Sequence, residues 1–385
     1  MERSEASQMG LARRIAVVGG GIIGMSTALE LRKAGCDVTL FEQNSLAGSV
    51  SWAANGALTP YSDHNSSSTV TKLAEQGVQR YVDHVEWLTV TTGLPIDLDA
   101  GGVLEVFLGE EGEKSEARFL ELGQAGYPVA LLDGNDARKL EGALSTQTTA
   151  AIHYMEETRI DTRQLLRASI KALDLLGVNV RCPSRVLRVD PSRSYSYVTV
   201  TLPDNAEEFD AAVLCTGYGR CEVAGMPQIP LHRVRGELIE VMPATPLASR
   251  CLYRGDSFIT PRRDGRLLLG TNYDFHEDGM DENTNSVSVG GAITKMTAAI
   301  SIVPEIARAE ILNTWKSWRP TTYDNRPVIG CYGSPNLLVA LGLGGLGITL
   351  APAIAAALAA AIAGESAATA FAELHDLRPE RPGLF

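Results

Sequence analysis

The chain has 385 residues, of which 45% are hydrophobic and 21% are charged, as in a soluble globular enzyme large enough for two domains. Its formal net charge of −12 argues against nonspecific binding to nucleic acid or to an anionic membrane, because both need a basic surface. The six cysteines form no C-x-x-C pair, which favours reduced thiols in a cytoplasmic protein over disulfides or zinc. Residues 1–12 are polar and lack an apolar signal core, so we expect a flexible tail and no export.

The strongest pattern lies near the N-terminus, where GGGIIG at residues 19–24 follows the apolar run Arg14–Val18. We expect that run to be a buried parallel strand, residues 25–34 to be a helix, and Asp37–Phe41 to be a second strand that ends on Glu42. This strand–helix–strand context makes a G-x-G-x-x-G motif a strong signal for an adenine dinucleotide.

Each glycine of the motif has a separate physical role. Gly19 permits the tight turn, Gly21 lets the backbone approach a pyrophosphate, and Gly24 lets the helix pack closely on the strand. The helix N-terminus offers free N–H groups and partial positive charge to the phosphates. Glu42 would accept a hydrogen bond from a ribose 2′-hydroxyl and repel a 2′-phosphate. The motif by itself leaves NAD and FAD open.

The next segments read as alternating helices and strands after a polar loop at residues 48–56. Helices are expected at 69–92, 110–125 and 161–176, and strands at 102–108, 178–181, 185–189, 197–202 and 208–215. Asp161 is placed to cap its helix, and Gln164 is placed to reach back and complete a capping box.

From His232 the pattern changes to antiparallel strands. These are expected at residues 234–241, 257–260 and 266–270, with Asp264-Gly265 as the hairpin turn between the last two. A helix at 288–302 follows, and the α/β pattern returns at Trp315. The nucleotide-binding domain is therefore predicted to be assembled from separated pieces, with ligands bound at strand carboxyl ends and between domains.

Residues 337–363 carry no charge and are long enough to span a bilayer. The glycines at positions 342, 344, 345 and 347 would break such a helix. We therefore predict a buried strand at Leu337–Leu341, a glycine loop, and a packed alanine-rich helix at about 349–363, with a membrane span as the alternative.

The combination resembles the glycine oxidase and D-amino acid oxidase/dehydrogenase family (DAO family) of FAD flavoproteins, over about residues 13–364. The resemblance rests on motifs in the family's order. They are IAVVG to Gly24 with Glu42, SWAANGALTP at 51–60, VLCTG at 213–217, VRGE at 234–237, TPRRDGR at 260–266 with its continuation to Gly270, WRPTT at 318–322 with PVIG at 327–330, and the glycine loop at 342–347.

This resemblance implies an α/β fold. It consists of a Rossmann-like, glutathione-reductase-like FAD-binding domain formed by residues 13–60, 150–230 and 315–385. An inserted α+β substrate domain with a mostly antiparallel sheet would comprise 61–149 and 231–314. FAD is expected to be noncovalent, because no cysteine lies in residues 315–321, where sarcosine oxidase relatives attach the flavin.

The resemblance also implies the residues that bind FAD. They are Gly19, Gly21, Ile22, Ile23, Gly24, Glu42, Gln43, Ser51, Trp52, Ala54, Asn55, Gly56, Val186, Thr216, Gly217, Arg319, Gly344, Gly345, Leu346, Gly347, Ile348 and Thr349. Val186 would meet the adenine through its backbone, although a plain strand residue is nearly as good a reading. N–H groups of the glycine loop would face the flavin N1/O2 edge, where charge collects on reduction.

For the substrate, the resemblance makes Arg319 the partner of the carboxylate, because a guanidinium fork binds carboxylate at two points. The alternative is a structural arginine in a salt bridge, with Arg254 or Arg262 as the anchor instead. Phe258 stands where relatives often carry a tyrosine, and Tyr273 is a candidate for the missing hydroxyl. These three residues, Arg319, Tyr273 and Phe258, are the predicted catalytic set; His232 and His276 flank the pocket as weaker candidates.

The implied reaction is hydride transfer from the amine-bearing carbon of an amino acid or related amine to flavin N5, giving an imine that hydrolyses. Oxygen, a quinone or a partner redox protein would reoxidise the flavin, so an oxidase and a dehydrogenase both stay open. Leu343 replaces a histidine common in relatives, and with Phe258 it favours a bulkier or secondary amine as much as glycine. A flavin monooxygenase, an NAD(P) dehydrogenase and a noncatalytic flavin subunit are the competing classes, and the oligomeric state is left open.

Overall fold

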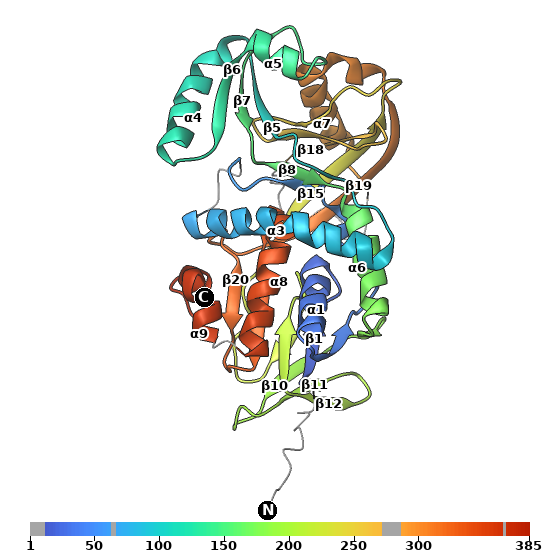
Figure 1. Cartoon of the computed structure of the whole chain (residues 1–385), viewed down its shortest axis with the longest axis vertical. Coiled ribbons are helices and arrows are strands. Elements are labelled where there is room, and N and C mark those ends of the chain that lie inside the picture. The colour runs from blue at the N-terminus through green and yellow to red at the C-terminus, as the bar shows by residue number, and fades with distance from the viewer. Residues whose placement is uncertain (1–11, 63–66, 272–285, 365–366) are drawn as a thin grey trace, which may run out of the picture.

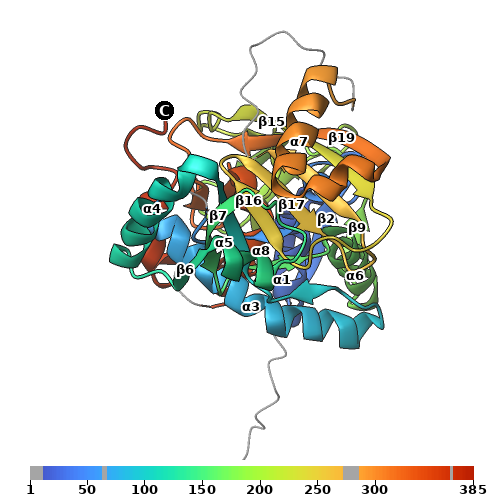
Figure 2. The same ribbon diagram turned by 90° about the horizontal axis from the view of Figure 1, so that it is seen from above.

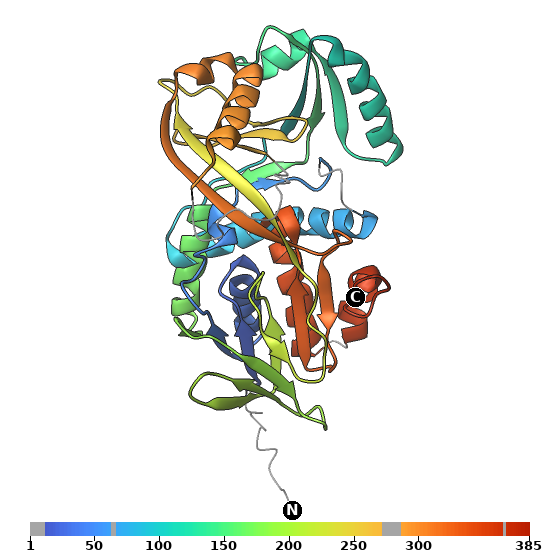
Figure 3. The ribbon, with the colours of Figure 1, turned by 180° about the vertical axis from the view of Figure 1, so that it is seen from behind.

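The computed structural model describes residues 12–62, 67–271, 286–364 and 367–385. The chain forms two lobes stacked along its longest axis (Figure 1), one around a six-stranded sheet and one around an eight-stranded sheet. Two long paired strands, β15 (His232–Met242) and β19 (Glu310–Thr321), run from the second lobe toward the first, as Figure 3 shows from behind.

The six-stranded sheet has the order β20-β21-β13-β1-β2-β9. Its strands are β1 (Arg14–Val18), β2 (Asp37–Phe41), β9 (Asn179–Arg181), β13 (Ala211–Leu214), β20 (Val328–Cys331) and β21 (Leu337–Leu341). All neighbouring pairs are parallel except β20–β21. Strands buried on both faces need continuous apolar runs, which explains why the sequence pattern alone locates β1, β2 and β21 at their observed bounds.

Helices cover one face of this sheet. They are α1 (Ile22–Lys33), α3 (Ser68–Thr92), α6 (Thr162–Leu175) and α8 (Gly347–Ala363), and they share one hydrophobic core with side chains of β1, β13 and β21. A four-stranded sheet of the order β12-β11-β10-β14 covers the other face and shares a second core with the alternate side chains. Its strands are β10 (Arg188–Pro191), β11 (Val198–Thr201), β12 (Ala206–Phe209) and β14 (Glu222–Val223).

Helix α8 belongs to the core of this lobe. Residues 344–363 are the one stretch of helix in the described chain that is long and apolar enough to cross a membrane, yet 67% of that window is buried inside the protein. It packs against α1 and α3. Burial against α1 and α3 explains the apolar composition of α8, in agreement with the packed helix predicted after the glycine loop.

The eight-stranded sheet has the order β19-β15-β18-β17-β16-β5-β7-β6. Besides β15 and β19 it contains β5 (Val103–Leu108), β6 (Val129–Asp133), β7 (Thr148–Tyr154), β16 (Cys251–Arg254), β17 (Ser257–Pro261) and β18 (Leu267–Thr271). Neighbours are antiparallel except β16 and β5. Helix α7 (Val289–Ile302) packs on β15 to β18, and Figure 2 shows it above β16 and β17.

The remaining elements are short or peripheral. They are α2 (Val50–Ala53), α4 (Gly112–Gln124), α5 (Gly134–Leu140), α9 (Ala367–Ala370), four 3₁₀ turns (Gly109–Glu111, Pro304–Arg308, Gly344–Leu346 and Ala372–Leu377) and a small sheet of β3 (Ala57–Leu58), β8 (Thr158–Ile160) and β4 (Leu98–Asp99).

Three local expectations were wrong. The strand predicted at 208–215 is two strands in different sheets, β12 and β13, because Asp210 turns the chain between them and its carboxylate accepts the backbone N–H of Arg14 at 2.7 Å. Asp161 caps α6 as expected, but the side chain of Gln164 accepts the N–H of Asp97 at 2.7 Å and completes no capping box. The Rossmann helix α1 begins at Ile22, three residues before its predicted start.

Strand β19 went unpredicted, because Glu310 to Thr314 are exposed and lack strand-like alternation. The strand continues through position 315, which was the expected boundary between the two domains. It pairs with β15 from Glu310 to Thr321, so these two strands belong to the eight-stranded sheet throughout that length.

Candidate active site

The glycine motif forms the turn between β1 and α1 and lines a cavity of about 190 Å³, called here the glycine-turn cavity. A Cβ atom on Gly24 would lie 1.8 Å from the carbonyl oxygen of Gly19, and one on Gly19 would lie 2.3 Å from the carbonyl of Cys215. Gly19 also has φ +113°, a conformation that other residues rarely adopt. These two glycines are therefore required by the protein's own packing, as the motif predicted.

Gly21 has a different role. A Cβ atom there would meet only the Ser51 hydroxyl, at 3.3 Å, and Gly21 lines the cavity. Gly21 is the N-cap residue of α1 and has no side chain with which to cap the helix. Instead, the Ser51 hydroxyl accepts the N–H of Ile22 at 3.0 Å. The helix N-terminus and its positive partial charge thus face the cavity, where phosphate groups bind favourably.

Glu42 lies at the end of β2 and holds the turn together. One carboxylate oxygen accepts the N–H of Gly20 at 2.7 Å, and the other accepts the N–H of Asn44 at 2.8 Å. Each oxygen keeps a second lone pair, so the side chain retains the capacity to accept a ribose hydroxyl. A small cavity of about 40 Å³ continues past Glu42 and Gln43 to Val186 and Thr216 (the Val186 cavity).

Cys215 directly follows β13, and its side chain is buried. Burial raises the pKa of the thiol to about 12, so it stays protonated and uncharged at neutral pH. The residues that follow, Thr216 and Gly217, line the glycine-turn cavity.

A second cavity, of about 120 Å³, lies between these loops and the eight-stranded sheet; we call it the sheet-face cavity. It shares Ile22, Val50, Ser51, Gly344 and Gly347 with the glycine-turn cavity, so the two adjoin each other. One wall is made by α2 and the loop after it, and by the 3₁₀ turn that leads into α8. The opposite wall is one face of the sheet.

The register of the sheet explains which side chains form that wall. Leu238 of β15 pairs with Trp315 of β19 on one side and with Gly270 of β18 on the other, and Gly270 pairs with Phe258 of β17. Phe258 in turn pairs with Tyr253 of β16. Residues directly opposite in neighbouring strands share a face, so these five form one row across the sheet.

Phe258 is buried and its ring lies over the backbone of Gly270, where an added Cβ would come within 2.4 Å of the ring. Its ring centroid is 5.9 Å from that of Tyr253. Both aromatic residues line the sheet-face cavity. Phe258 has no hydroxyl, but Tyr253 on the neighbouring strand brings one to the same cavity. Tyr253 was not among the residues predicted from the sequence.

Arg319 comes from β19 and is half-buried. Its guanidinium folds over Gly236 of β15, where an added Cβ would lie 2.8 Å from the nearest guanidinium nitrogen. It donates a long hydrogen bond, 3.4 Å, to the carbonyl of Thr271. Among the described residues that line the sheet-face cavity, Arg319 is the one with a full charge.

The other two arginines considered as anchors are held elsewhere. Arg254 pairs with Glu111 at 2.9 Å. Arg262 is buried and donates to the carbonyl of Asn55 at 2.7 Å. Arg262 therefore supports the loop that forms one wall of the sheet-face cavity, and Arg319 is the arginine that lines the cavity itself.

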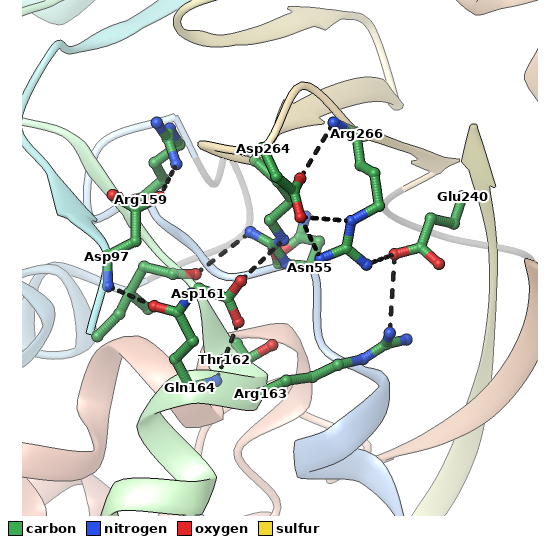
Figure 4. Close-up of polar contacts among 12 residues, drawn as sticks. Asn55, Asp97, Arg159, Asp161, Thr162, Arg163, Gln164, Glu240, Asp264 and Arg266 are labelled. Atoms are coloured by element: carbon green, nitrogen blue, oxygen red, sulfur yellow. Dashed lines mark hydrogen bonds and ion pairs between the residues drawn. The ribbon is translucent and has the colours of Figure 1, made fainter. Parts of the chain in front are cut away.

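The same loop has a second support on its other side. The Trp315 indole N–H donates to the carbonyl of Ala53 at 3.1 Å. The Trp52 ring lies 5.5 Å from the Trp315 ring, and the Arg163 guanidinium lies over both, 4.2 and 4.7 Å from their centroids. Arg163 and Arg266 both reach Glu240, at 3.7 and 2.6 Å, in the network of Figure 4.

The structure brings most of the predicted cofactor residues to the two cavities and the Val186 cavity. Lining residues are Gly19, Gly21, Ile22, Ile23, Glu42, Gln43, Ser51, Ala54, Asn55, Val186, Thr216, Gly217, Arg319, Gly344, Gly345, Leu346, Gly347 and Ile348. Four predicted residues stand outside these linings: Gly24, Gly56 and Thr349, which are buried, and Trp52, which is exposed. Tyr273 and His276 lie outside the described residues.

Sequence reasoning missed Tyr253, Ser317 and Ser62, which also line the sheet-face cavity. Ser317 pairs with Gly236, so it lies beside Arg319 on the same face of the sheet. Period-two alternation from Arg319 would have pointed to Ser317, but β19 went unrecognised as a strand. Tyr253 carries no local signal, because cross-strand pairing alone places it in the row.

Comparison with known proteins gives a family match over most of the chain. The model of the DAO family, described as FAD dependent oxidoreductase, matches residues 14–361. A glycine oxidase of Bacillus licheniformis is 28% identical over 345 residues, which cover 88% of this chain and 89% of that protein.

The bifunctional protein ThiO/ThiG of a Synechocystis species is 29% identical over 352 residues, which cover 89% of this chain but 50% of that protein. The chain thus spans about half the length of this bifunctional relative. Among solved structures, glycine oxidase from Geobacillus kaustophilus superposes with a TM-score of 0.81 at 26% identity, covering 91% of this chain and 95% of that one. An iminodiacetate oxidase from Chelativorans shares the fold, with a TM-score of 0.78 at 22% identity, covering 91% and 96%.

Proposed function

Since this chain belongs to the DAO family of FAD dependent oxidoreductases, we propose that it oxidises the C–N bond of a small amino acid or related amine that carries a carboxylate. The product is an imine, which water hydrolyses. The observation that carries the proposal is the sheet-face cavity, in which the single charged lining residue of the described chain, Arg319, faces loops of the dinucleotide site.

The residues present fit FAD. Gly344, Gly345 and Gly347 line the sheet-face cavity, and a Cβ on any of them would come no closer than 3.7 Å to another protein atom. Gly344 has φ +53°, which by itself favours glycine, but at Gly345 and Gly347 neither packing nor backbone conformation demands it, whereas close approach of a planar ligand to the backbone does. The N-cap residue of α8 provides no side-chain cap, so N–H groups at that helix N-terminus are available to an electron-rich ring edge.

When bound, FAD supplies a two-electron acceptor for the hydride that leaves the amine-bearing carbon. Residues of the glycine-turn and Val186 cavities would hold the ADP half, and those shared with the sheet-face cavity would hold the ring. Gly21 and the α1 N-terminus would hold the pyrophosphate, and Glu42 would accept a hydrogen bond from the adenosine ribose.

The protein's part in the reaction is mainly positioning. The Arg319 fork binds the substrate carboxylate and so fixes the direction of the C–H bond. Phe258 and Leu238 exclude water from the reacting carbon. No carboxylate or imidazole of the described residues lines this cavity, so the amine would enter as the neutral base, and its lone pair would form the C=N bond as the hydride leaves the carbon.

The hydroxyls of Tyr253 and Ser317 are the proposed second contacts of the substrate. Ser317 lies two residues before Arg319 on the same face of the sheet. Tyr253 lies in the row of cross-strand pairs that ends at Trp315 of the same strand. Glycine, N-substituted glycines such as iminodiacetate, and D-amino acids carry the carboxylate that Arg319 selects. Relatives named glycine oxidase and iminodiacetate oxidase support this substrate class.

The test is anaerobic reduction of the FAD-loaded protein. Glycine, N-methylglycine, iminodiacetate, D-alanine and L-proline are mixed with it in a stopped-flow spectrometer, and bleaching of the flavin band is followed. We expect at least one of them to bleach the flavin, and oxygen consumption then shows whether oxygen serves as acceptor. Matched amines without a carboxylate, such as methylamine, should bleach it far more slowly; equal rates would contradict the carboxylate anchor.

We further propose a glutathione-reductase-like FAD domain formed by 13–60, 150–230 and 315–385, with 61–149 and 231–314 as the substrate domain. The order of the six-stranded sheet supports the first assignment in outline. Strands β7 and β19 of the eight-stranded sheet extend across the boundaries at 150 and 315, and α3 packs in the core of the six-stranded sheet, so these boundaries divide elements that the two sheets keep whole. A cytoplasmic location is proposed on the unpaired state of the six cysteines and the net charge of −12. Gel filtration with light scattering would establish the oligomeric state.

A further inference from the structure

We propose that the protein has a second ligand site, adjoining the FAD site, for a phosphorylated organic anion of about nucleotide size. The site is a cavity of about 580 Å³ on the face of the six-stranded sheet opposite α1 and α8. We call it the meander cavity, because β10 to β12 pack on the same face. Its volume lies in the range of small-molecule sites in proteins.

The floor of the meander cavity is apolar and built from the sheet. Leu214, Val339 and Leu341 line it, and they belong to the core shared with β10 to β12, whereas their neighbours in sequence face the helices. Ile229 and Met226 add apolar surface from the segment that leads to β15. A floor of this kind accepts the apolar or aromatic body of a ligand.

The rim is cationic, although the whole chain is acidic. Arg185, Arg220 and Arg233 line the cavity and are exposed; Arg185 and Arg220 stand at its border with the Val186 cavity, which they also line, whereas Arg233 lines the meander cavity but not the Val186 cavity. Within the described chain, no carboxylate pairs with Arg185 or Arg220. The acidic lining residue, Glu222, already pairs with Arg188 at 2.8 Å. The rim thus carries excess positive charge, and guanidinium groups bind phosphate at two points.

The meander cavity is coupled to the FAD site through the segment that follows β13. Thr216, Tyr218 and Gly219 line both the meander cavity and the glycine-turn cavity. The Arg233 guanidinium lies 4.7 Å from the centre of the Tyr218 ring, and the Tyr218 hydroxyl is 2.8 Å from that of Ser49, which lines the glycine-turn cavity.

A ligand that holds Arg233 therefore also holds Tyr218 and Ser49 against the dinucleotide. Coupling between two ligands is reciprocal, so occupancy of the meander cavity should slow the release of FAD, and bound FAD should tighten the second ligand. This makes cofactor retention a readout of the second site that is independent of turnover.

The experiment uses the FAD-loaded protein, so that the nucleotide cannot occupy the ADP half of the FAD site. ADP is titrated by calorimetry, with inorganic pyrophosphate and adenosine as separate probes for the anion and for the apolar body. We expect ADP to bind once per chain and more tightly than either fragment. The rate of FAD release after dilution, followed by flavin fluorescence, should fall at least threefold.

Two variants test the location. Arg233→Gln removes a rim charge that lines the meander cavity but neither the glycine-turn nor the Val186 cavity, and it should weaken ADP at least tenfold while FAD stays bound. Leu187→Trp enlarges an exposed side chain at the same cavity and should also weaken ADP.

Arg193→Gln is the matched control, because it removes the same charge from an exposed position of the β10–β11 turn outside the cavity. It should leave ADP binding within twofold. Three results would overturn the proposal: no ADP binding at millimolar concentration, stoichiometric displacement of FAD by ADP, or equal effects of Arg233→Gln and Arg193→Gln.

Discussion

The glycine-turn cavity and the sheet-face cavity adjoin each other, yet they are built in opposite ways. The first is formed largely by backbone, at a turn whose glycines are required by contacts within a few ångströms. The second is formed largely by side chains that four strands and a loop bring together from Ala53 to Arg319. In the proposed function, the first would bind a cofactor common to many proteins, whereas the second would select the substrate.

This difference predicts that substitutions in the sheet-face cavity change turnover and spare the cofactor. Arg319→Ala should lower kcat/KM roughly a thousandfold, about 4 kcal/mol, because the substrate carboxylate loses its charged partner. Steady-state kinetics with the best substrate, together with the flavin spectrum of the purified variant, measure both halves of this expectation. Arg319→Lys keeps the charge without the fork and should recover part of the activity; loss of FAD from the alanine variant would contradict the division of roles.

Substitutions in the glycine turn should do the reverse. Gly24→Ala places a Cβ 1.8 Å from the Gly19 carbonyl oxygen, so α1 must shift and FAD binding should weaken by roughly 3 kcal/mol, with lower thermal stability. The control is Gly345→Ala, whose Cβ meets no protein atom within 4 Å. Its apo form should melt within about 0.5 kcal/mol of the wild type while FAD binds more weakly. Equal loss of apo stability in both variants would refute the assignment of Gly345 to the ligand.

Substitutions that weaken the support of the loop after α2, which contains Asn55, should have an effect smaller than those at Arg319 and Gly24. Arg262→Gln removes the donor to the Asn55 carbonyl, and we expect about 2 kcal/mol weaker FAD binding, or roughly thirtyfold in Kd. The flavin absorption maximum should shift as well, because the loop lies beside the ring. Arg266→Gln removes an arginine of the same network that contacts Asp264 and Glu240, and it should leave the Kd for FAD nearly unchanged. A similar loss in both variants would mean that the network acts only through overall stability.

The smallest expected effect concerns the segment of the sheet-face cavity that contains Thr59 and Ser62. Buried Glu157 accepts the N–H groups of Tyr61 and Ser62 at 2.8 and 2.7 Å, and burial nevertheless raises the pKa of its carboxyl to about 8. A folded-state pKa above the ordinary value of 4.5 means that the folded protein holds a proton which the unfolded chain releases. This stabilisation is complete below about pH 4.5 and is lost as the pH rises to about 8.

Glu157→Gln imitates the protonated acid and removes this dependence. Between pH 7 and pH 8.5, the stability of the variant relative to the wild type should rise by about 1–2 kcal/mol, measured by urea unfolding at each pH. A difference that stays constant with pH, or falls, would show that Glu157 is ionised in the folded protein throughout this range.

The part of the fold that sequence alone could predict is the part with local causes. β1, β2 and β21 are continuous apolar runs, and the glycine motif makes its own turn, so both follow from neighbouring residues. Arg319 was identified by its motif and does line the sheet-face cavity. The break at Asp210 escaped prediction, because the partner that sets it, Arg14, is distant in sequence.

Sequence by itself determined that this chain binds a dinucleotide through a glycine turn and where that turn lies, because backbone sterics and strand burial act over a few residues. Tertiary structure alone decided the row from Tyr253 to Trp315, the pairing that makes β19 a strand, and the support of Asn55 by Arg262. These features depend on strand register, and register is set by the packing of whole sheet faces rather than by any local pattern. The glycine-turn cavity can therefore be predicted from a local motif, whereas the lining of the sheet-face cavity depends on how the strands pair.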